Sequence, residues 1–186
     1  MPATRRPNRG PSAAAENRAA LIAAAREVFA GAGYSAPLSM VARAAGVGQG
    51  SLYRHFPDRV SLAMAVFEEG VTELEALAAE PGTTLDDVLA LMTEQTIAST
   101  AFIDMVTLTP IDPDPRILGI RDRVAGLLAG VLADPARTAG IRPDVTADDL
   151  VLVVGMLAGV LAKTAAPARR RTADRVWKLL RAGIEA

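Results

Sequence analysis

The fold is decided by residues 39–59, which read SMVARAAGVGQGSLYRHFPDR. Apolar residues at helical spacing predict a short first helix. Gly46 then supplies a residue that adopts a left-handed backbone without a Cβ penalty, which is typical of a helix end. A second helix is predicted from about Gln49 to His55, and Pro57 ends it. This order is typical of a helix-turn-helix, whose second helix enters the major groove of DNA.

Each side of this pair of helices has a predicted role. Ser39 is expected to cap the first helix with its side-chain oxygen, and Ala42 is small enough to let the second helix cross closely. Val47 is expected to fill the turn, whereas Leu52 and Phe56 are expected to anchor the second helix on the core. The first helix is expected to turn its apolar residues inward, and these are Met40, Val41, Ala44 and Ala45.

The polar side of the second helix carries groups that suit DNA. Glutamine reads an adenine edge and serine contacts several bases, whereas tyrosine and arginine are common donors to phosphates. Asp58 is expected to cap the next helix, and Arg59 lies in that helix's first turn, where the helix dipole disfavours a cation unless a phosphate accompanies it. From spacing alone, an ordinary packed pair of helices remains an alternative. The residues predicted to contact DNA are Ser39, Gln49, Gly50, Ser51, Tyr53, Arg54, His55 and Arg59.

A longer stretch around this motif resembles the TetR/AcrR family of bacterial transcriptional regulators. The resemblance covers about residues 18–70, and its order and spacing are specific. It implies three N-terminal helices that bind double-stranded operator DNA, followed by a helical body that binds a small molecule and dimerises. The matching residues are Ala23-Ala24-Ala25-Arg26-Glu27-Val28-Phe29, Gly31-Ala32-Gly33-Tyr34, Val41-Ala42, Ala45-Gly46-Val47, the run from Gly50 to Arg59, and Leu62.

Three positions depart from the family pattern. Gly48 stands where a serine or threonine cap is usual, and glycine is an acceptable N-cap at a cost of roughly a few tenths of a kcal/mol. Arg59 replaces the usual lysine, and arginine binds phosphate with a planar fork. Val60-Ser61 replaces the acidic residues common there, so the usual capping box is predicted to be missing. None of these departures changes the predicted fold.

Charge is unevenly distributed along the 186 residues, although the formal net charge is only −1. Residues 1–60 hold 8 arginines and 3 acidic residues, a net charge of +5. Residues 61–186 hold the other 12 basic and 18 acidic residues, a net charge of −6. A basic module on an acidic body is expected when one part of a protein meets phosphates. Chance asymmetry in an arginine-rich genome is the alternative.

Composition disfavours several classes of protein. The chain has no cysteine, which excludes disulfides and thiol catalysis and fits a reducing compartment. No apolar stretch follows the basic N-terminus, so no secretory signal is expected. The longest apolar run, residues 150–162, is shorter than the roughly 20 residues that span a bilayer. We therefore expect a cytoplasmic protein with no membrane partner.

The whole chain predicts an all-α fold of about nine helices and no strands. Residues 1–15 are expected to form a flexible basic arm, whose arginines either reach the minor groove or remain solvated. Residues 16–60 are predicted to form the helix-turn-helix domain, and residues 61–186 the effector-binding and dimerisation domain. The predicted helices span about residues 16–30, 40–45, 49–55, 58–79, 84–100, 102–108, 116–133, 147–163 and 168–184.

The last two predicted helices indicate a homodimer. The helix over residues 147–163 is apolar nearly all round and must be covered on every side. Its two glycines on one face would let another helix approach closely. Packing within one chain is the alternative, and the resemblance favours the dimer. The predicted interface residues are Val151, Gly155, Gly159, Trp177 and Leu180.

A small-molecule effector is expected to bind the middle of the chain. Methionines adapt to irregular ligand shapes, and a few polar groups fix the orientation of a ligand. The effector is expected to be largely apolar, and ordinary core packing is the alternative role for each residue. The predicted pocket residues are Phe67, Met92, Gln95, Phe102 and Met105.

Together these features predict a sequence-specific transcriptional regulator, a repressor that an effector releases from a palindromic operator. A ligand-independent DNA-binding or architectural protein is the alternative. A helical enzyme is disfavoured, because Asp112 and Asp114 lie among prolines and His55 is the only histidine. No cluster has metal-ligand spacing, so neither a metal nor a cofactor is expected.

Overall fold

The structure is a computed structural model, and it describes residues 11–98, 115–138 and 140–184. In these ranges the regular elements are eight α-helices and two short 3₁₀ helices, which confirms the predicted all-α fold. The predicted helix 102–108, with Phe102 and Met105, lies outside the described residues. The α-helices are α1 (Pro11–Ala32), α2 (Leu38–Ala44), α3 (Gln49–His55), α4 (Arg59–Ala79), α5 (Leu85–Ala98), α7 (Pro115–Leu132), α8 (Ala147–Ala162) and α9 (Arg169–Ile184). The 3₁₀ helices span Pro135–Arg137 and Ala166–Ala168.

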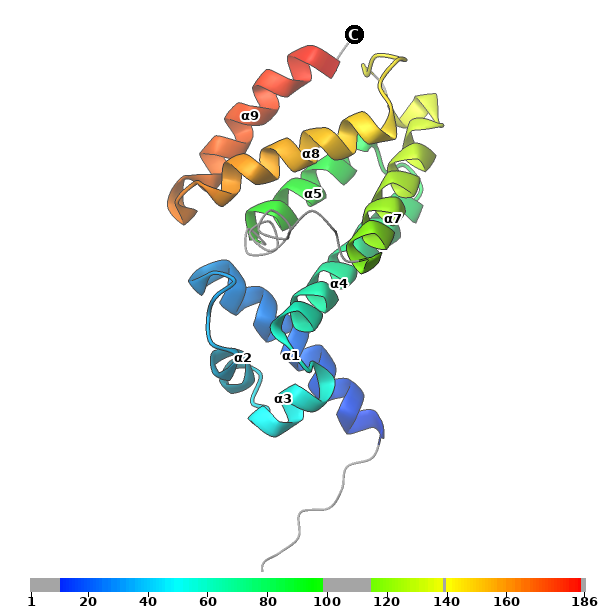
Figure 1. Ribbon diagram of the computed structural model, residues 1–186. Helices are drawn as coiled ribbons and strands as arrows, with labels where there is room; N and C mark the ends of the chain where they lie inside the picture. Colours follow the sequence, from blue (N-terminus) through cyan, green and yellow to red (C-terminus); the bar gives the residue numbers. More distant parts are fainter. Residues whose placement is uncertain (1–10, 99–114, 139, 185–186) are drawn as a thin grey trace, which may run out of the picture.

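Helix α4 joins two parts of the molecule (Figure 1). Helices α1, α2 and α3 lie together at one end and are called the N-terminal module here, whereas α4 to α9 form the body. Helix α4 contacts α1 in the module and α5 and α7 in the body, while α8 contacts α5, α7 and α9. One hydrophobic core runs through both parts, and its fully buried leucines include Leu21, Leu52, Leu62, Leu85, Leu128 and Leu150.

Most helix boundaries agree with the pattern of the sequence. Helices α3, α4, α7, α8 and α9 begin and end within one residue of their predicted limits. Helix α1 begins at Pro11, five residues before its predicted start at 16. Proline is tolerated in the first turn of a helix and alanines 13–15 favour helix. In addition, the Ser12 hydroxyl donates to Glu16 Oε1 at 2.9 Å. Residues 11–15 of the predicted arm are therefore helical.

The predicted start of α2 is wrong. The N-cap is Pro37 and no side chain caps the helix, while Ser39 is its second residue. Leu38 is 9% exposed, so burial of this side chain draws it into the first turn. Helix α2 turns Val41 and the small Ala42 inward, as the buried residues show.

Two apolar residues of α2 that were expected to be buried are exposed to solvent. Met40 is 42% exposed, and Ala44 is also exposed. Periodicity alone did not identify the buried face, because almost every residue of this short helix is apolar or small.

The predicted absence of a capping box at α4 is also wrong. Asp58 is the N-cap, as expected, and its Oδ1 accepts a hydrogen bond from the backbone N–H of Ser61 at 2.6 Å. The backbone N–H of Asp58 donates in return to Ser61 Oγ at 3.3 Å. Serine therefore takes the place that glutamate or glutamine usually has in this motif. The hydrogen bonds from Ser61 hold the pKa of the Asp58 carboxyl below its ordinary value.

Candidate nucleic-acid interface

The turn between α2 and α3 is built around Gly46. Its φ of +66° lies in the left-handed region, which an L side chain rarely adopts. The backbone N–H groups of Gly46 and Val47 donate to the carbonyls of Arg43 and Ala42 at 3.1 and 2.9 Å. These bonds satisfy the last carbonyls of α2 and make the turn tight. The predicted role of glycine at this position is confirmed.

Helix α3 is anchored to the module by two apolar side chains. Leu52 is 0% exposed and Phe56 is 3% exposed, which confirms both predicted anchors. Gly48 is the N-cap, with extended backbone and no side-chain hydrogen bond. The helix packs against both α1 and α2. Its opposite face is therefore presented to the outside at a fixed angle.

That outer face carries most of the groups predicted to contact DNA. Arg54 Nε donates to the carbonyl of Gly50 at 3.2 Å, so the arginine side chain lies along the helix. Tyr53 is 53% exposed, a high value for an aromatic residue. The exposed members of the face are Gln49, Gly50, Tyr53 and Arg54, whereas Ser51, His55 and the more distant Ser39 are half-buried. An amide, a phenol and a guanidinium on one short helix provide donors for base edges and for phosphates.

Arg59 has an intramolecular role that its sequence position did not reveal. Its Nη1 donates to the carbonyl of Ala36 at 2.5 Å and also to the carbonyl of Tyr34. The guanidinium lies 5.5 Å from the centre of the Tyr34 ring and 6.0 Å from that of Phe29, within the range of cation–π attraction. Arg59 therefore closes the loop between α1 and α2. A phosphate contact by this residue stays a prediction.

The environment of Tyr34 is partly apolar. Burial raises the pKa of its phenol, although the nearby positive charge of Arg59 acts in the opposite direction. The ring also lies 5.8 Å from that of Phe29. These contacts hold the loop before α2 in place, and the loop in turn positions α2, the first helix of the helix-turn-helix.

Two further arginines of the module were not singled out from the sequence. Arg18 of α1 is exposed, and its guanidinium lies 5.3 Å from the centre of the Phe56 ring at the end of α3. Arg43 is exposed in the last turn of α2. In the described residues neither forms an ion pair with a carboxylate. Only their charge could have marked them, because the contact of Arg18 with Phe56 joins segments far apart in the sequence.

The chain matches a known protein family over this part of the fold. Residues 21–66 match the family model described as "Bacterial regulatory proteins, tetR family". A solved TetR transcriptional regulator from Streptomyces coelicolor is 25% identical with a TM-score of 0.67, and the match covers 90% of this chain and 98% of that chain. The chain belongs to the TetR family.

Two more solved structures extend the likeness. A TetR transcription regulatory protein from Mycobacterium vanbaalenii is 27% identical with a TM-score of 0.60, and the match covers 94% of this chain and 98% of that chain. CprB, a TetR family protein from Streptomyces coelicolor solved in complex with its biological operator sequence, is 24% identical with a TM-score of 0.58. That match covers 90% of this chain and 88% of that chain. None of the curated proteins matches the chain. This TetR-family chain is a DNA-binding transcriptional regulator.

The predicted pocket residues of this TetR-family chain lie on two neighbouring helices where they are described. Met92 of α5 is 6% exposed and belongs to the core, whereas Phe67 of α4 is half-buried. Gln95 of α5 donates from Nε2 to the carbonyl of Gly70 at 3.0 Å and to Glu73 Oε2 at 3.1 Å. Helices α4 and α5 contact each other, and the hydrogen bonds of Gln95 cross that contact. Their role in binding an effector stays a prediction.

Two hollows lie elsewhere in the described body. One of about 310 Å³ lies between α4 and α7 and includes Ala78, Leu127 and Arg137 in its lining. Another of about 430 Å³ lies beside the segment that leads to α8 and includes Leu132 and Val145. Neither is lined by any of the predicted pocket residues. In the described ranges, no group of three His, Asp or Glu side chains is placed to hold a metal ion, and no helix is long and apolar enough to cross a membrane.

The predicted dimer residues of this TetR-family chain do not share one environment. Gly155 of α8 is exposed, while Val151, Gly159 and Leu180 are half-buried. Trp177 of α9 packs on the core of its own chain, and its Nε1 donates to Thr93 Oγ1 of α5 at 2.6 Å. Trp177 therefore has an intrachain role, and its place in a dimer interface stays a prediction.

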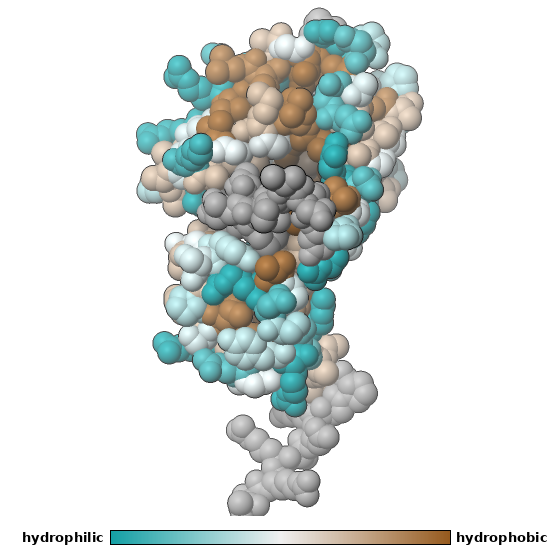
Figure 2. Space-filling model, viewed as in Figure 1, coloured by the Kyte–Doolittle hydropathy of each residue, from teal (hydrophilic) through white to brown (hydrophobic). Residues whose placement is uncertain are grey.

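The exposed apolar side chains on α8 and α9 are not the residues predicted individually for the dimer interface, although both helices were predicted to form it. The exposed fractions are 62% for Leu152, 52% for Met156, 44% for Val160 and 70% for Leu179. Figure 2 shows hydrophobic side chains gathered on the part of the surface formed by α8 and α9. We call Leu152, Met156, Val160 and Leu179 the apolar face. The spacing of 152, 156 and 160 at every fourth residue was the available signal, since these positions fall on one side of a helix.

Proposed function

We propose that this TetR-family chain is a repressor that binds a palindromic operator as a homodimer and is released by a small, largely apolar effector. The carrying observation is the outer face of α3. There Gln49, Tyr53 and Arg54 are exposed, while Leu52 and Phe56 fix the helix from the other side. Residues 16–60 form the DNA-binding unit in this proposal, and residues 61–186 form the effector-binding and dimerisation unit.

Each residue of the proposed interface has a chemical task. Gln49 and Ser51 contact base edges, and Gly50 lets the backbone of α3 approach the groove because no side chain intervenes. Tyr53, Arg54 and His55 contact phosphates on the flank of the site. CprB, which shares this fold, was solved with its operator, and that complex supports the assignment of DNA as partner.

The homodimer is supported by the apolar face. Leu152, Met156 and Val160 follow one side of α8, and Gly155 and Gly159 lie among them with no atom within 4 Å of where a Cβ would stand. A helix of a second copy can therefore approach α8 closely. A monomer rarely leaves a contiguous apolar patch of this kind in water. A two-fold dimer presents two copies of α3 to two related half-sites of DNA.

The effector site is proposed at the contact between α4 and α5, near Phe67 and Met92, together with Phe102 and Met105. Helix α4 reaches from the N-terminal module into the body, so a change around it alters the orientation of α3. Regulation then requires the effector to bind the released state more tightly than the DNA-bound state. A coupling of about 1–3 kcal/mol is typical of such regulators.

The DNA part of the proposal is tested by selecting duplexes from a random-sequence pool with the full-length chain at fixed salt. We expect a two-fold symmetric sequence with half-sites about one helical turn or more apart. A reporter gene with this sequence in its promoter should be expressed less when the chain is produced. Recovery of unrelated sequences, bound no tighter than random DNA, would contradict a sequence-specific regulator. Increased expression would contradict repression.

The effector part is tested with a library of small apolar compounds. A true effector raises the melting temperature of the chain, because it binds the folded state, and releases the selected duplex at the same concentrations. Compounds that stabilise the chain but leave DNA binding unchanged would favour the alternative of a ligand-independent DNA-binding protein. Substitution of Met92 by alanine should weaken binding of the true effector and leave the affinity for DNA in its absence unchanged.

A further inference from the structure

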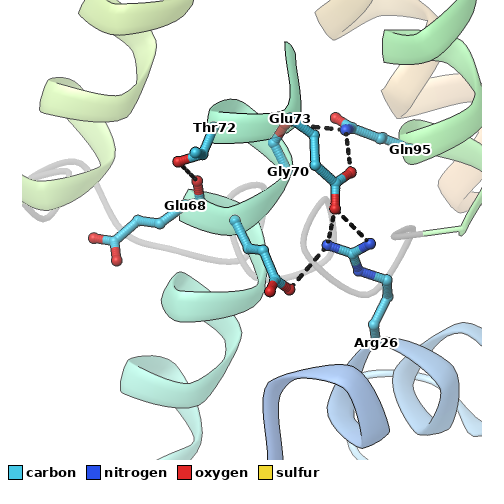
Figure 3. A network of polar contacts seen from close by, with 7 residues as sticks. Arg26, Glu68, Gly70, Thr72, Glu73 and Gln95 are labelled. Atoms are coloured by element: carbon cyan, nitrogen blue, oxygen red, sulfur yellow. Dashed lines mark hydrogen bonds and ion pairs between the residues drawn. The ribbon is translucent and has the colours of Figure 1, made fainter. Parts of the chain in front are cut away.

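Three helices meet at the side chain of Glu73 (Figure 3). Glu73 lies on α4, and its Oε1 accepts hydrogen bonds from Nη1 and Nη2 of Arg26 on α1, both at 2.9 Å. Its other oxygen, Oε2, accepts from Nε2 of Gln95 on α5 at 3.1 Å. Arg26 Nη2 also donates to Glu69 Oε2, one turn earlier on α4, at 3.1 Å. One carboxylate thus connects the N-terminal module to α5.

Gln95 is held against α4 at a second point. Its Nε2 donates to the carbonyl of Gly70 at 3.0 Å. A Cβ on Gly70 would lie 3.2 Å from Gln95 Oε1, closer than side chains normally approach. Glycine at this position therefore lets the amide reach the backbone of α4 and Glu73 together. The contact is specific, because it depends on a missing side chain as well as on two hydrogen bonds.

The position of Arg26 connects this network with the DNA-binding face. Helix α1 packs against both α2 and α3, and the three helices share one core. A rotation of α1 relative to α4 therefore moves α3 as part of one unit. Arg26 itself is on α1 and takes no part in the outer face of α3. Any influence it has on DNA binding must therefore come from the orientation of the module.

We propose that Arg26, Glu69, Glu73 and Gln95 form a positioning clamp that sets the angle of the N-terminal module relative to the body. The clamp rests on the proposed function, since it determines the distance between the two α3 helices of a dimer. Gln95 is its connection to the predicted effector site, so displacement of this amide loosens the hold on Glu73 and then on Arg26. Glu69 and Glu73 are like charges one turn apart, and Arg26 forms an ion pair with each, which offsets their mutual repulsion.

An ordinary stabilising ion pair is the competing explanation, and the chain offers a matched control. Arg123 of α7 donates to both oxygens of Glu75 on α4 at 2.9 and 2.7 Å. The exposed fractions of the Arg123 and Arg26 side chains are similar, at 40% and 35%. Arg123 joins two helices of the body, whereas Arg26 joins the module to the body. Stability should respond similarly to the loss of either arginine, and only the clamp should affect the geometry of DNA binding.

The test uses the full-length chain and the duplex selected from random DNA, together with duplexes whose half-site spacing is increased by one or two base pairs. The parent chain should prefer its selected spacing. In Arg26→Gln this preference should fall by about three- to tenfold, the size expected for one exposed arginine shared by two carboxylates. Affinity for a duplex with a single half-site should stay unchanged. In Arg123→Gln the spacing preference should stay at the parent value.

The possible results separate the clamp from the proposed function. A parent chain without any spacing preference would refute both the dimeric regulator and the clamp. A parent chain with a preference that Arg26→Gln retains would refute the clamp alone. An equal loss of preference in Arg123→Gln would also refute it, because general destabilisation would then explain the effect.

Gln95→Met tests whether the amide belongs to the same unit. Methionine keeps a similar volume but removes the donor to Gly70 and Glu73. Gln95→Met should reduce the spacing preference, and adding it to Arg26→Gln should cause little further loss, because both changes release the same carboxylate. Independent, additive losses would overturn the inclusion of Gln95 in the clamp.

Discussion

Helices α3 and α8 present opposite kinds of surface within one helical fold. Helix α3 turns Leu52 inward and exposes an amide, a phenol and a guanidinium. Helix α8 buries Leu150, Val153, Leu157 and Leu161, yet it still exposes Leu152, Met156 and Val160. The apolar side of α3 is buried within a single chain, and its exposed side presents polar groups to a polar partner. Helix α8 keeps apolar side chains exposed until another apolar surface covers them.

The largest effect is expected when the anchor of α3 is removed. Leu52 is 0% exposed, so Leu52→Ala should lower the free energy of unfolding by about 2–5 kcal/mol through lost burial and a cavity. The affinity for every DNA sequence should fall as well, because α3 loses its fixed position. Denaturant unfolding and DNA titration measure the two effects.

Leu152→Ala is the matched control for that prediction. The same side chain is removed, but Leu152 is 62% exposed in the single chain, so it leaves no internal cavity. Unfolding of the isolated chain should change little. An equal loss of stability in both variants, measured at concentrations where the chain is monomeric, would contradict the contrast between the two helices.

The next largest effect is expected at the part of the apolar face that lies on α8. Met156→Glu places a charge where a second copy should cover the surface, so the chain should sediment near its monomer mass of 19.4 kDa. Affinity for the two-half-site duplex should fall about a hundredfold, because binding of the second half-site is no longer intramolecular. Affinity for one half-site should stay the same.

Met156→Leu serves as its control, since leucine keeps the face apolar and close in volume. This variant should remain a dimer at micromolar concentration. A parent chain that already sediments as a monomer at that concentration would refute the dimer, whatever the variants do.

The sequence predicted the parts of the site that depend on neighbouring residues. Gly46 ends α2, Leu52 and Phe56 anchor α3, and Asp58 caps α4, because each of these roles follows from local spacing. The all-α fold and most helix limits follow from the same periodicity. The capping box at Ser61 was missed because serine is an unusual partner in it.

Local sequence patterns could not predict contacts between segments that lie far apart in the chain. Arg59 bonds to carbonyls of Tyr34 and Ala36 across the module, and nothing in its neighbourhood indicates them. Helix α9 carries apolar residues on two sides, so periodicity did not show that Trp177 faces its own chain and Leu179 the outside. Glu73 and Gln95 likewise meet through tertiary packing alone.

A smaller effect is expected at a single base position. Gln49→Ala removes an exposed amide from the outer face of α3 and should relax the preference for one base pair by about 1–3 kcal/mol. A binding selection repeated with the variant measures this change. Arg54→Gln is the contrasting variant: it should weaken binding to all sequences and reduce the salt dependence by about one phosphate contact. An unchanged base preference in Gln49→Ala would contradict a base-reading role.

The smallest effect concerns the start of α4. Asp58→Ala should lower the free energy of unfolding by about 1 kcal/mol at neutral pH, because Ser61 N–H loses its acceptor. The pKa of Asp58 is lowered in the folded chain, so its charged form stabilises the fold above the ordinary pKa of 3.8, and this contribution disappears as the pH falls through the lower folded value. The difference in unfolding free energy between the parent and Asp58→Ala should therefore shrink in acid.

Asp58→Asn separates the cap from the charge. Asparagine accepts the same hydrogen bond but does not titrate, so this variant should keep most of the stability at neutral pH and lose the acid dependence that Asp58 contributes. The cap lies at the junction of the module and α4, and both variants leave the outer face of α3 untouched. If Asp58→Asn were as unstable as Asp58→Ala at neutral pH, the charge rather than the hydrogen bond to Ser61 would hold this helix end, through its attraction to the positive end of the helix dipole.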